Sequence, residues 1–380
     1  MRSGYGKFLL VLATVSSSLL VACNSGGASF NQGPPPPQSA EFLFGADLAG
    51  VVITQKVDTT TGALSGATQT TGSNGNAIAA NPAGTFLYAS DPSANAVDGF
   101  SMSSSGTLTG ISGSPFVLPG PGVVSGIVVD SSGKYLYASS SNSGTGSVAA
   151  FSIDGISGAL TPVAGSPFAA GTSPVNIAVS PGNPFLYVSD AGSGLLGFSI
   201  SPSTGALTPI AGSPFAGGSQ GVAITPNGKF AYAIAIDTSV WAYSIDSTSG
   251  VLTAISGSPF LAVPGGQSFT TQILVDPLGR YVYTYNTVGT TSISALAINA
   301  TSGALSQVSG SPYITNSSDY FAANLAIDPS GSFLYASCSS GSCGVLGFSI
   351  DGTTGGLSPL SGSPFNSQFN IGSMAIIEFK

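Results

Sequence analysis

Residues 177–215, IAVSPGNPFLYVSDAGSGLLGFSISPSTGALTPIAGSPF, carry the pattern that decides the fold. An apolar Ile-x-Val segment runs into a Pro/Gly turn, and Phe-Leu-Tyr, Phe-Ser-Ile and Ala-Leu-Thr-Pro follow before Gly-Ser-Pro-Phe. The apolar segments are short and are separated by Gly, Pro, Asn and Ser, which is typical of strands joined by tight turns. The stretch therefore predicts one small antiparallel sheet of four strands.

The same pattern recurs from residue 41 to the end of the chain. Its clearest marker is the Leu-Tyr pair, found as Leu87-Tyr88, Leu136-Tyr137, Leu186-Tyr187, Ala231-Tyr232, Val282-Tyr283 and Leu334-Tyr335, with Leu43-Phe44 as a weaker seventh copy. Successive tyrosines are 49, 50, 45, 51 and 52 residues apart. A period of this length, made only of strand signals, predicts a β-propeller with four strands in each blade.

The two ends of the repeat region indicate the number of blades. Residues 23–40 include four consecutive prolines and predict an extended spacer. This spacer leads directly into Glu41-Phe-Leu-Phe44, so the first repeat has no opening strand. The last repeat is complete, yet Ser373 to Lys380 continues with a strand pattern. We therefore expect this tail to close an all-β, seven-bladed propeller over residues 41–380, built of four-stranded antiparallel blades.

The repeat resembles that of the lactonase-type seven-bladed propellers. The matching phrases are DPSGSFLY at 328–335, GFSID at 347–351 and TGGL at 354–357. That family includes the propeller-type bacterial 6-phosphogluconolactonase, fungal carboxymuconate cyclase and the related surface-protein YVTN repeats. The resemblance covers about residues 41–380. It implies the propeller fold and, for the enzymes, His, Arg and Glu side chains on one face around the central channel.

The chain departs from that family in the residue types that its enzymes use. It contains no His, and the places before Ile-x-Val where family members often have a His hold Asn76, Ser125, Val175, Gln220, Thr271 and Ala323. Lys134, Lys229 and Arg280 each follow a turn glycine, where we expect the charge to face solvent. We therefore predict no catalytic residue, and a phosphorylated substrate would lack the cations that neutralise it.

Composition and charge exclude several further classes of function. Only 6% of the residues are charged, and the net charge is −8, which argues against a nucleic-acid partner. Most acidic residues fall at turn positions, where a carboxylate caps backbone N–H groups. No Asp-x-Asp-x-Asp cluster is present, so we predict neither a metal site nor a cofactor.

The residues just before each Ile-x-Val segment are the candidate ligand-binding residues. The first strand of each propeller blade lines the axis, so these side chains should ring one channel mouth. By register they are Asn76, Ser125, Gln220 and Thr271, with Asn324 one place further along. All are neutral hydrogen-bond donors and acceptors. Such a ring suits a sugar-like ligand better than an ion.

Residues 1–22 predict a lipoprotein signal peptide. A positively charged start precedes an apolar stretch at 8–15 that is too short to span a bilayer. Leu20-Val-Ala-Cys23 resembles the lipobox of bacterial lipoproteins, which implies cleavage before Cys23 and its acylation. The alternative is an ordinary secretory signal with a chance cysteine. In enteric lipoproteins an Asp directly after the acylated Cys retains the protein at the inner membrane. Asn24 stands at this position here, so we expect a lipid anchor in the outer membrane and no other membrane contact.

Cys338 and Cys343 are the two cysteines outside the anchor. They flank a short Ser/Gly segment between two expected strands of the last repeat. A hairpin would place them opposite each other, and an exported protein meets an oxidising compartment. We predict a Cys338–Cys343 disulfide that staples the tip of this loop.

Two functions remain open from the sequence. The favoured one is a surface-displayed binding or scaffold module, for a neutral sugar-like ligand or a protein partner, because the family's catalytic residue types are absent. The alternative is a hydrolase or lyase of a lactone or sugar that uses carboxylates and hydroxyl groups at the channel mouth. That alternative requires two carboxylates, or one with a raised pKa, at the floor of a pocket.

Overall fold

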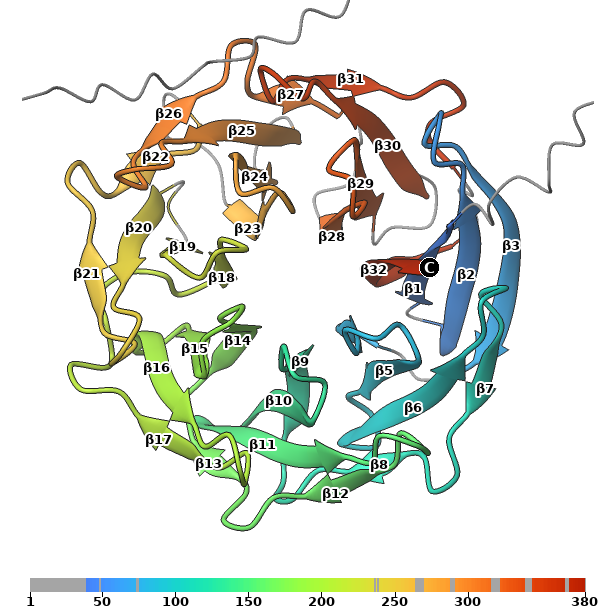
Figure 1. Ribbon diagram of the computed structural model, residues 1–380, viewed down its shortest axis with the longest axis vertical. Coiled ribbons are helices and arrows are strands. Elements are labelled where there is room, and N and C mark those ends of the chain that lie inside the picture. The colour runs from blue at the N-terminus through green and yellow to red at the C-terminus, as the bar shows by residue number, and fades with distance from the viewer. Residues whose placement is uncertain are drawn as a thin grey trace, which may run out of the picture. The chain divides into compact units, whose positions relative to one another are not determined.

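The computed structural model describes residues 39–47, 49–72, 75–235, 237, 239–263, 270–287, 291–315, 322–338, 344–365 and 369–379. These residues form seven antiparallel sheets arranged as blades around a central axis (Figure 1). The predicted all-β, seven-bladed propeller is thereby confirmed. In this part of the chain no helix is long and apolar enough to cross a membrane.

Each blade takes its strands from one repeat, except blade 1. Blade 1 contains β1 (Ala40–Asp47), β2 (Val51–Val57), β3 (Leu64–Thr71) and β32 (Ile371–Phe379). Blade 2 contains β4 (Ile78–Ala80), β5 (Phe86–Asp91), β6 (Ala96–Met102), β7 (Leu108–Gly110) and β8 (Phe116–Val117). Blade 3 contains β9 (Val123–Val129), β10 (Tyr135–Asn142), β11 (Thr145–Ile153), β12 (Leu160–Pro162) and β13 (Phe168–Ala169). Blade 4 contains β14 (Pro174–Val179), β15 (Phe185–Asp190), β16 (Gly194–Ile200) and β17 (Leu207–Pro209). Blade 5 contains β18 (Gly221–Ile224), β19 (Phe230–Ile234), β20 (Ser239–Ile245), β21 (Leu252–Ala254) and β22 (Phe260–Leu261). Blade 6 contains β23 (Thr270–Val275), β24 (Tyr281–Asn286), β25 (Ser292–Ile298), β26 (Leu305–Gln307) and β27 (Tyr313–Ile314). Blade 7 contains β28 (Ala322–Ile327), β29 (Phe333–Cys338), β30 (Val345–Ile350) and β31 (Leu357–Pro359).

The sequence motifs lie side by side within a blade. In blade 3, Leu136 of the Leu-Tyr pair lies between Val129 of Ile-x-Val and Phe151 of Phe-Ser-Ile. The Gly-Ser-Pro-Phe segment then folds back onto the third strand, where the Ser166 hydroxyl accepts a hydrogen bond from the Ala150 N–H at 2.9 Å. The corresponding serine makes the same bond in all six repeats that carry the motif.

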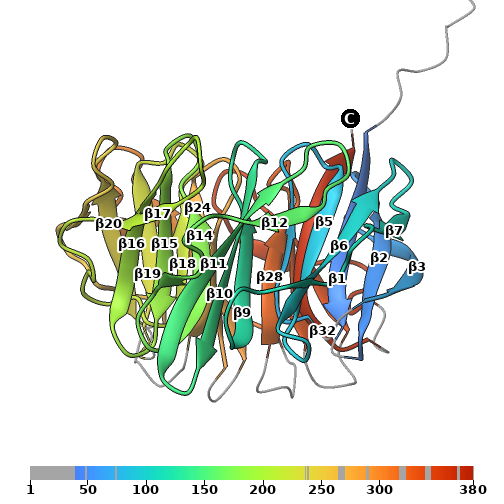
Figure 2. The ribbon, with the colours of Figure 1, turned by 90° about the horizontal axis from the view of Figure 1, so that it is seen from below.

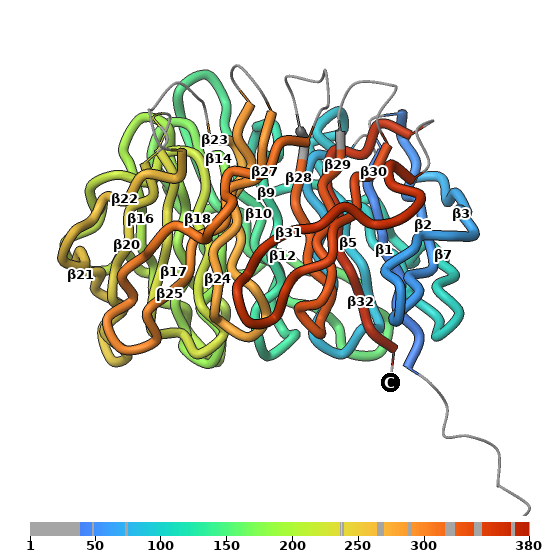
Figure 3. The backbone as a smooth tube through the Cα atoms, turned by 90° about the horizontal axis from the view of Figure 1, so that it is seen from above, coloured from blue at the N-terminus to red at the C-terminus, as the bar shows by residue number. Residues whose placement is uncertain are grey.

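The C-terminal strand closes the ring. β32 pairs with β1 along its length, from Ala40 opposite Phe379 to Asp47 opposite Ile371, and becomes the innermost strand of blade 1. This confirms the predicted closure, with the strand starting two residues before Ser373. β1 begins and β32 ends on the face that carries the first hairpin turn of each blade (Figures 2 and 3). We call it the turn face, and the opposite one, where β32 begins, the loop face.

The tyrosine of each Leu-Tyr pair joins neighbouring blades. Its side chain is fully buried, and burial raises its pKa. Its hydroxyl donates to the carbonyl of a turn glycine in the next blade, as from Tyr187 to Gly250 at 2.6 Å. The other pairs are Tyr88–Gly158, Tyr137–Gly205, Tyr232–Gly303, Tyr283–Gly355 and Tyr335–Gly62. At the blade 1–blade 2 interface, Phe44 takes the place of the tyrosine.

Candidate functional site

All seven blades contribute side chains to one cavity on the propeller axis. The cavity measures about 230 Å³ and is lined by the starts of the innermost strands β4, β9, β14, β18, β23, β28 and β32. These strands surround the centre of the ring in Figure 1. Its polar lining residues are Asn76, Ser125, Asn176, Gln220, Gln272, Asn324 and Ser373. Because Asn176, Gln272, Asn324 and Ser373 are each the third residue of their strands, the cavity lies in the loop-face half of the channel.

The structure brings four of the five sequence-derived candidates together and replaces the fifth. Asn76, Ser125, Gln220 and Asn324 all line the cavity, whereas Thr271 does not and Gln272 takes its place. β23 has a β-bulge between Thr270 and Gln272, so its side chains do not alternate strictly there and Gln272 reaches the cavity. The Thr271 hydroxyl is buried and has no hydrogen-bond partner among the described residues.

Asn176, Gln272 and Ser373 are the lining residues that the sequence analysis missed. Each directly precedes the Ile or Met that opens its Ile-x-Val segment, the position at which Asn324 was included. The signal in the sequence was therefore the recurrence of a polar residue at this position in several repeats. In blade 4, where β14 has a similar bulge, both this position and the one before it line the cavity, as Asn176 and Val175.

Two of the asparagines also connect neighbouring blades. The Val222 N–H of blade 5 donates to Asn176 Oδ1 at 3.4 Å, and the Met374 N–H of blade 1 donates to Asn324 Oδ1 at 3.2 Å. Their carboxamide oxygens are thereby held in position. A carboxamide also has an NH₂ group with two donors, and in both side chains it remains without a partner within the described chain. The cavity wall therefore offers pre-positioned donors.

Most acidic residues of the described chain serve the turns, and none of the described ones lines the cavity. Asp58, Asp154, Asp246 and Asp351 accept backbone N–H bonds within the outer hairpin turns, and these bonds lower the pKa of each carboxyl group. Asp130, Asp276 and Asp328 accept the backbone N–H groups that close the first hairpins. No group of His, Cys, Asp or Glu in the described part of the chain could hold a metal ion.

Among the described carboxyl groups, only that of Glu41 has its pKa raised by its surroundings. It is only 5% exposed, and its Oε2 has no hydrogen-bond partner in the described residues. Burial, with smaller contributions from Asp328 and from Glu378 directly opposite on β32, raises its pKa to about 7. Glu41 lies at the turn-face end of β1, however, whereas Ser373 and Met374 of the same blade line the cavity near the loop face. It is therefore not placed to act on a ligand there.

This carboxyl group predicts a pH dependence of stability. The folded state holds the proton up to about pH 7, whereas the unfolded chain loses it near its ordinary pKa, so stability falls as pH rises between these two values. Glu41→Gln should remove this loss, raising the unfolding free energy at pH 8 by up to about 3 kcal/mol and leaving it unchanged at pH 4. Urea unfolding at pH 4, 6 and 8 measures the difference. Parallel pH profiles of the two proteins would contradict the assignment.

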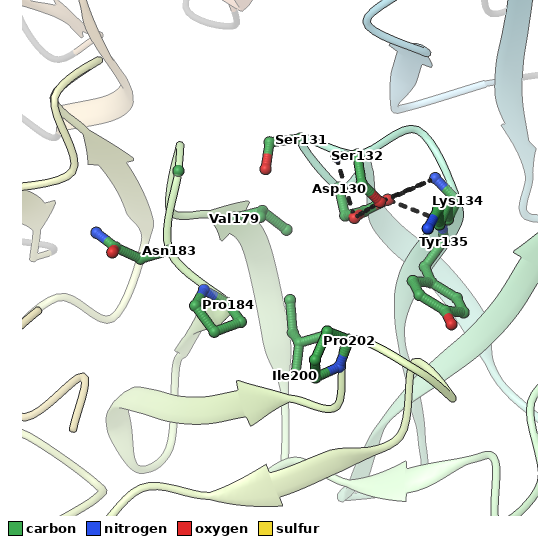
Figure 4. A pocket seen from close by; sticks show the side chains of 11 residues that line it. Asp130, Ser131, Ser132, Lys134, Tyr135, Val179, Asn183, Pro184, Ile200 and Pro202 are labelled. Carbon is green, nitrogen blue, oxygen red and sulfur yellow. Dashed lines mark hydrogen bonds between the residues drawn. The ribbon is translucent and has the colours of Figure 1, made fainter. Parts of the chain in front are cut away.

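A second pocket, of about 310 Å³, lies on the turn face between blades 3 and 4 (Figure 4). At three other blade interfaces the proline of one first turn lies against the glycine of the next, as Pro82 against Gly133, Pro226 against Gly279 and Pro277 against Gly331. Blade 3 has Ser131 at the proline position, which leaves a gap. The Asp130 carboxylate in its wall already accepts the Lys134 and Tyr135 N–H groups at 2.9 and 2.8 Å. The pocket is therefore a space between turns without a free catalytic pair among its lining residues.

One of the three turn cations, Arg280, does not face solvent as expected. Lys134 and Lys229 are exposed as predicted, but the Arg280 side chain is only 30% exposed. Its Nε donates to buried Asp276 at 2.8 Å and its Nη1 to the Gly352 carbonyl of blade 7 at 3.0 Å. The guanidinium also lies over the Tyr281 ring, 5.4 Å from its centroid. Arg280 thus ties blade 6 to blade 7 on the turn face, away from the cavity.

The remaining sequence-derived sites lie wholly or partly outside the described residues. Cys23 and its signal peptide precede residue 39, so the lipid anchor stays a prediction. Cys338 is the last residue of β29, but its side chain and Cys343 are outside the described part of the chain. The Cys338–Cys343 disulfide therefore stays a prediction.

Comparison with known proteins agrees with the seven-bladed propeller fold. The family model described as "Lactonase, 7-bladed beta-propeller" matches residues 47–168, 116–225 and 217–368. A candidate 6-phosphogluconolactonase from Bacteroides fragilis is 20% identical with a TM-score of 0.75, covering 91% of this chain and 100% of that one. The periplasmic gluconolactonase of Pseudomonas aeruginosa is 16% identical with a TM-score of 0.68, covering 90% and 99%. At these identities the structures share the fold alone. No curated protein matches the sequence.

Proposed function

Because this chain belongs to the lactonase family of seven-bladed β-propellers, and its axial cavity is lined by neutral polar side chains, we propose that it binds a neutral polyhydroxylated ring. The ligand class is a monosaccharide or its lactone. The carrying observation is the ring of amide and hydroxyl groups contributed by all seven blades. Gln220 and Gln272 have no side-chain hydrogen-bond partner within the described chain, so their amides are available to ligand hydroxyl groups.

The size and charge of the cavity support this ligand class. At about 230 Å³ it lies below the roughly 300–1,000 Å³ of sites for drug-sized ligands, so a single sugar ring is the appropriate scale. None of the described lining residues is a cation, and a phosphate or carboxylate would be desolvated there without a counter-charge. A neutral ring instead exchanges its water hydrogen bonds for bonds to amides and hydroxyl groups.

Hydrolysis of a lactone is the second candidate function. It is favoured by the family match and by the likeness to the Pseudomonas gluconolactonase. A hydrolase needs a group that activates water or the carbonyl, and the described lining contains no carboxylate, imidazole or ammonium group. We therefore propose binding without turnover as the main function of the cavity.

Calorimetric titration with D-glucose and D-glucono-1,5-lactone tests this proposal. Both neutral rings should bind, and gluconate, which carries a carboxylate, should not. Gln220→Ala or Gln272→Ala should each weaken binding by about 3- to 10-fold, the usual contribution of one hydrogen bond. Ser131→Ala, in the turn-face pocket, is the matched control and should change nothing. Equal binding by the glutamine variants would rule out the cavity, and lactone hydrolysis by the wild type would establish the second function.

We also propose that the protein is lipid-anchored in the outer membrane through Cys23. The described chain starts on the turn face (Figure 2), at the end of the propeller opposite the half that holds the cavity. A tether attached there leaves the cavity accessible. Cys23→Ser should prevent acylation and shift the protein from the membrane fraction to the soluble fraction, as measured by fractionation and immunoblotting. Membrane association that is unchanged in this variant would refute the anchor.

A further inference from the structure

Blade 1 differs from the other six blades at its outer edge. In blades 2 to 7 the outermost strand, β7, β12, β17, β21, β26 or β31, has three residues. The Gly-Ser-Pro-Phe segment then covers the rest of the third strand, as β8 does on β6 or as Phe215 does on Leu195. Each of these edges is therefore short and divided. Short edge strands and prolines are devices that prevent pairing with other chains.

The first repeat lacks Gly-Ser-Pro-Phe, so its outer strand continues. β3 has eight residues, Leu64 to Thr71, and pairs with β2 from Val57 to Val51. Ser65 to Gln69 and Thr71 are exposed, and the strand contains neither a charged residue nor a proline. In the sheet order β3-β2-β1-β32 it is the last member, and no described strand pairs with its outer edge. Its free N–H and C=O groups are a template for strand addition.

We propose that the outer edge of β3 pairs, antiparallel, with β3 of a second copy of this chain. Antiparallel pairing of two identical strands obeys a two-fold axis, so one surface serves both partners. A neutral edge makes this self-pairing free of like-charge repulsion. A β-bulge between Thr54 and Lys56 disturbs the start of β3, which confines its regular pairing with β2 to Thr68 to Thr71. Pairing centred on Gln69 also keeps Lys56, opposite Ser65, at the ends of the contact.

A groove beside this edge can receive side chains of the partner strand. It measures about 240 Å³ and lies between Gly66, Thr68 and Thr70 on one side and residues 105–108 of blade 2 on the other. The walls include Phe42, Leu108 and Lys56 together with threonine hydroxyl groups. The partner's threonine side chains, which carry a methyl and a hydroxyl group, match this mixed lining. The groove thus extends the contact beyond the backbone ladder.

Sedimentation of the purified full-length protein over a range of concentrations tests the proposal. The wild type should show a monomer–dimer equilibrium. Gln69→Lys should raise the dimer dissociation constant by about tenfold or more, because two like charges then face each other across the pair. Thr161→Lys is the matched control, since Thr161 is the exposed middle residue of the short edge strand β12, and it should dimerise like the wild type.

Hydrogen exchange provides a readout that needs no variant. Amides of residues 68–71 should be protected at high protein concentration and should lose this protection on dilution, whereas those of β12 should not change. A wild type that stays monomeric, or a dimer equally stable in Gln69→Lys and Thr161→Lys, would overturn the proposal. Concentration-independent protection of β3 would also overturn it, since a bound peptide or the chain itself would then cover the edge.

Discussion

Deletion of residues 371–380 is expected to leave the protein unfolded or aggregated. The deletion removes β32, which pairs with β1 along its whole length and buries Ile371 and Met374 in the core shared with blade 7. Burial of two such side chains contributes about 3–6 kcal/mol, a large part of the roughly 5–15 kcal/mol that stabilises a folded protein. The loss also exposes the edge of β1 and the start of β28, so the ring is open on both sides.

The role of the closing strand is tested by comparing the deletion of 371–380 with a deletion elsewhere in the chain. Removal of 24–38, the spacer expected from the sequence, should leave the melting temperature unchanged. Circular dichroism and size-exclusion chromatography of both proteins measure the contrast. If the protein without 371–380 melted like the full-length chain, closure through a split blade would not be needed for stability.

Gly250→Ala is expected to lower the unfolding free energy by about 2–5 kcal/mol. Gly250 has φ +72, which costs an alanine about 1–2 kcal/mol. A Cβ at this position would also lie 2.6 Å from Cδ1 of Phe185 in the neighbouring blade. The Gly250 carbonyl accepts a hydrogen bond from the Tyr187 hydroxyl of the same neighbouring blade. The turn therefore cannot move away from Phe185 without losing this bond. Forcing extra volume into such a packed contact costs about 1–3 kcal/mol more.

Two further variants separate the causes. Tyr187→Phe removes only the hydrogen bond and should cost about 1–3 kcal/mol, because the buried Gly250 carbonyl then lacks a donor. Gly110→Ala is the control and should be neutral, since a Cβ on Gly110 would meet no atom within 4 Å and its φ is not positive. Denaturant unfolding at one pH compares all three. A Gly250→Ala protein as stable as Gly110→Ala would show that the blade interface is not closely packed at this turn.

The candidate site shows how far residue-level reasoning from the sequence extends. Asn76, Ser125, Gln220 and Asn324 were placed at the axis because the first strand of a propeller blade is its innermost one. Thr271 was placed with them, but its neighbour Gln272 lines the cavity instead. At the corresponding bulges of blades 3 and 4, Ser125 and Val175 do reach the cavity, and the sequence around Thr271 carries no signal for this difference. The roles of Asn176 and Asn324 in holding the next blade depend on contacts that are about fifty residues apart in sequence.

The sequence by itself determined the repeat, the number of blades and the closing strand. These features rest on signals that are local in the sequence, namely strand periodicity, Pro/Gly turns and a first repeat that lacks one strand. Only the tertiary structure decided that Arg280 ties two blades together, that Gln272 faces the cavity and that β3 keeps a long free edge. Such features arise where different repeats meet, and the geometry there depends on atoms that the chain brings together only when the ring has closed.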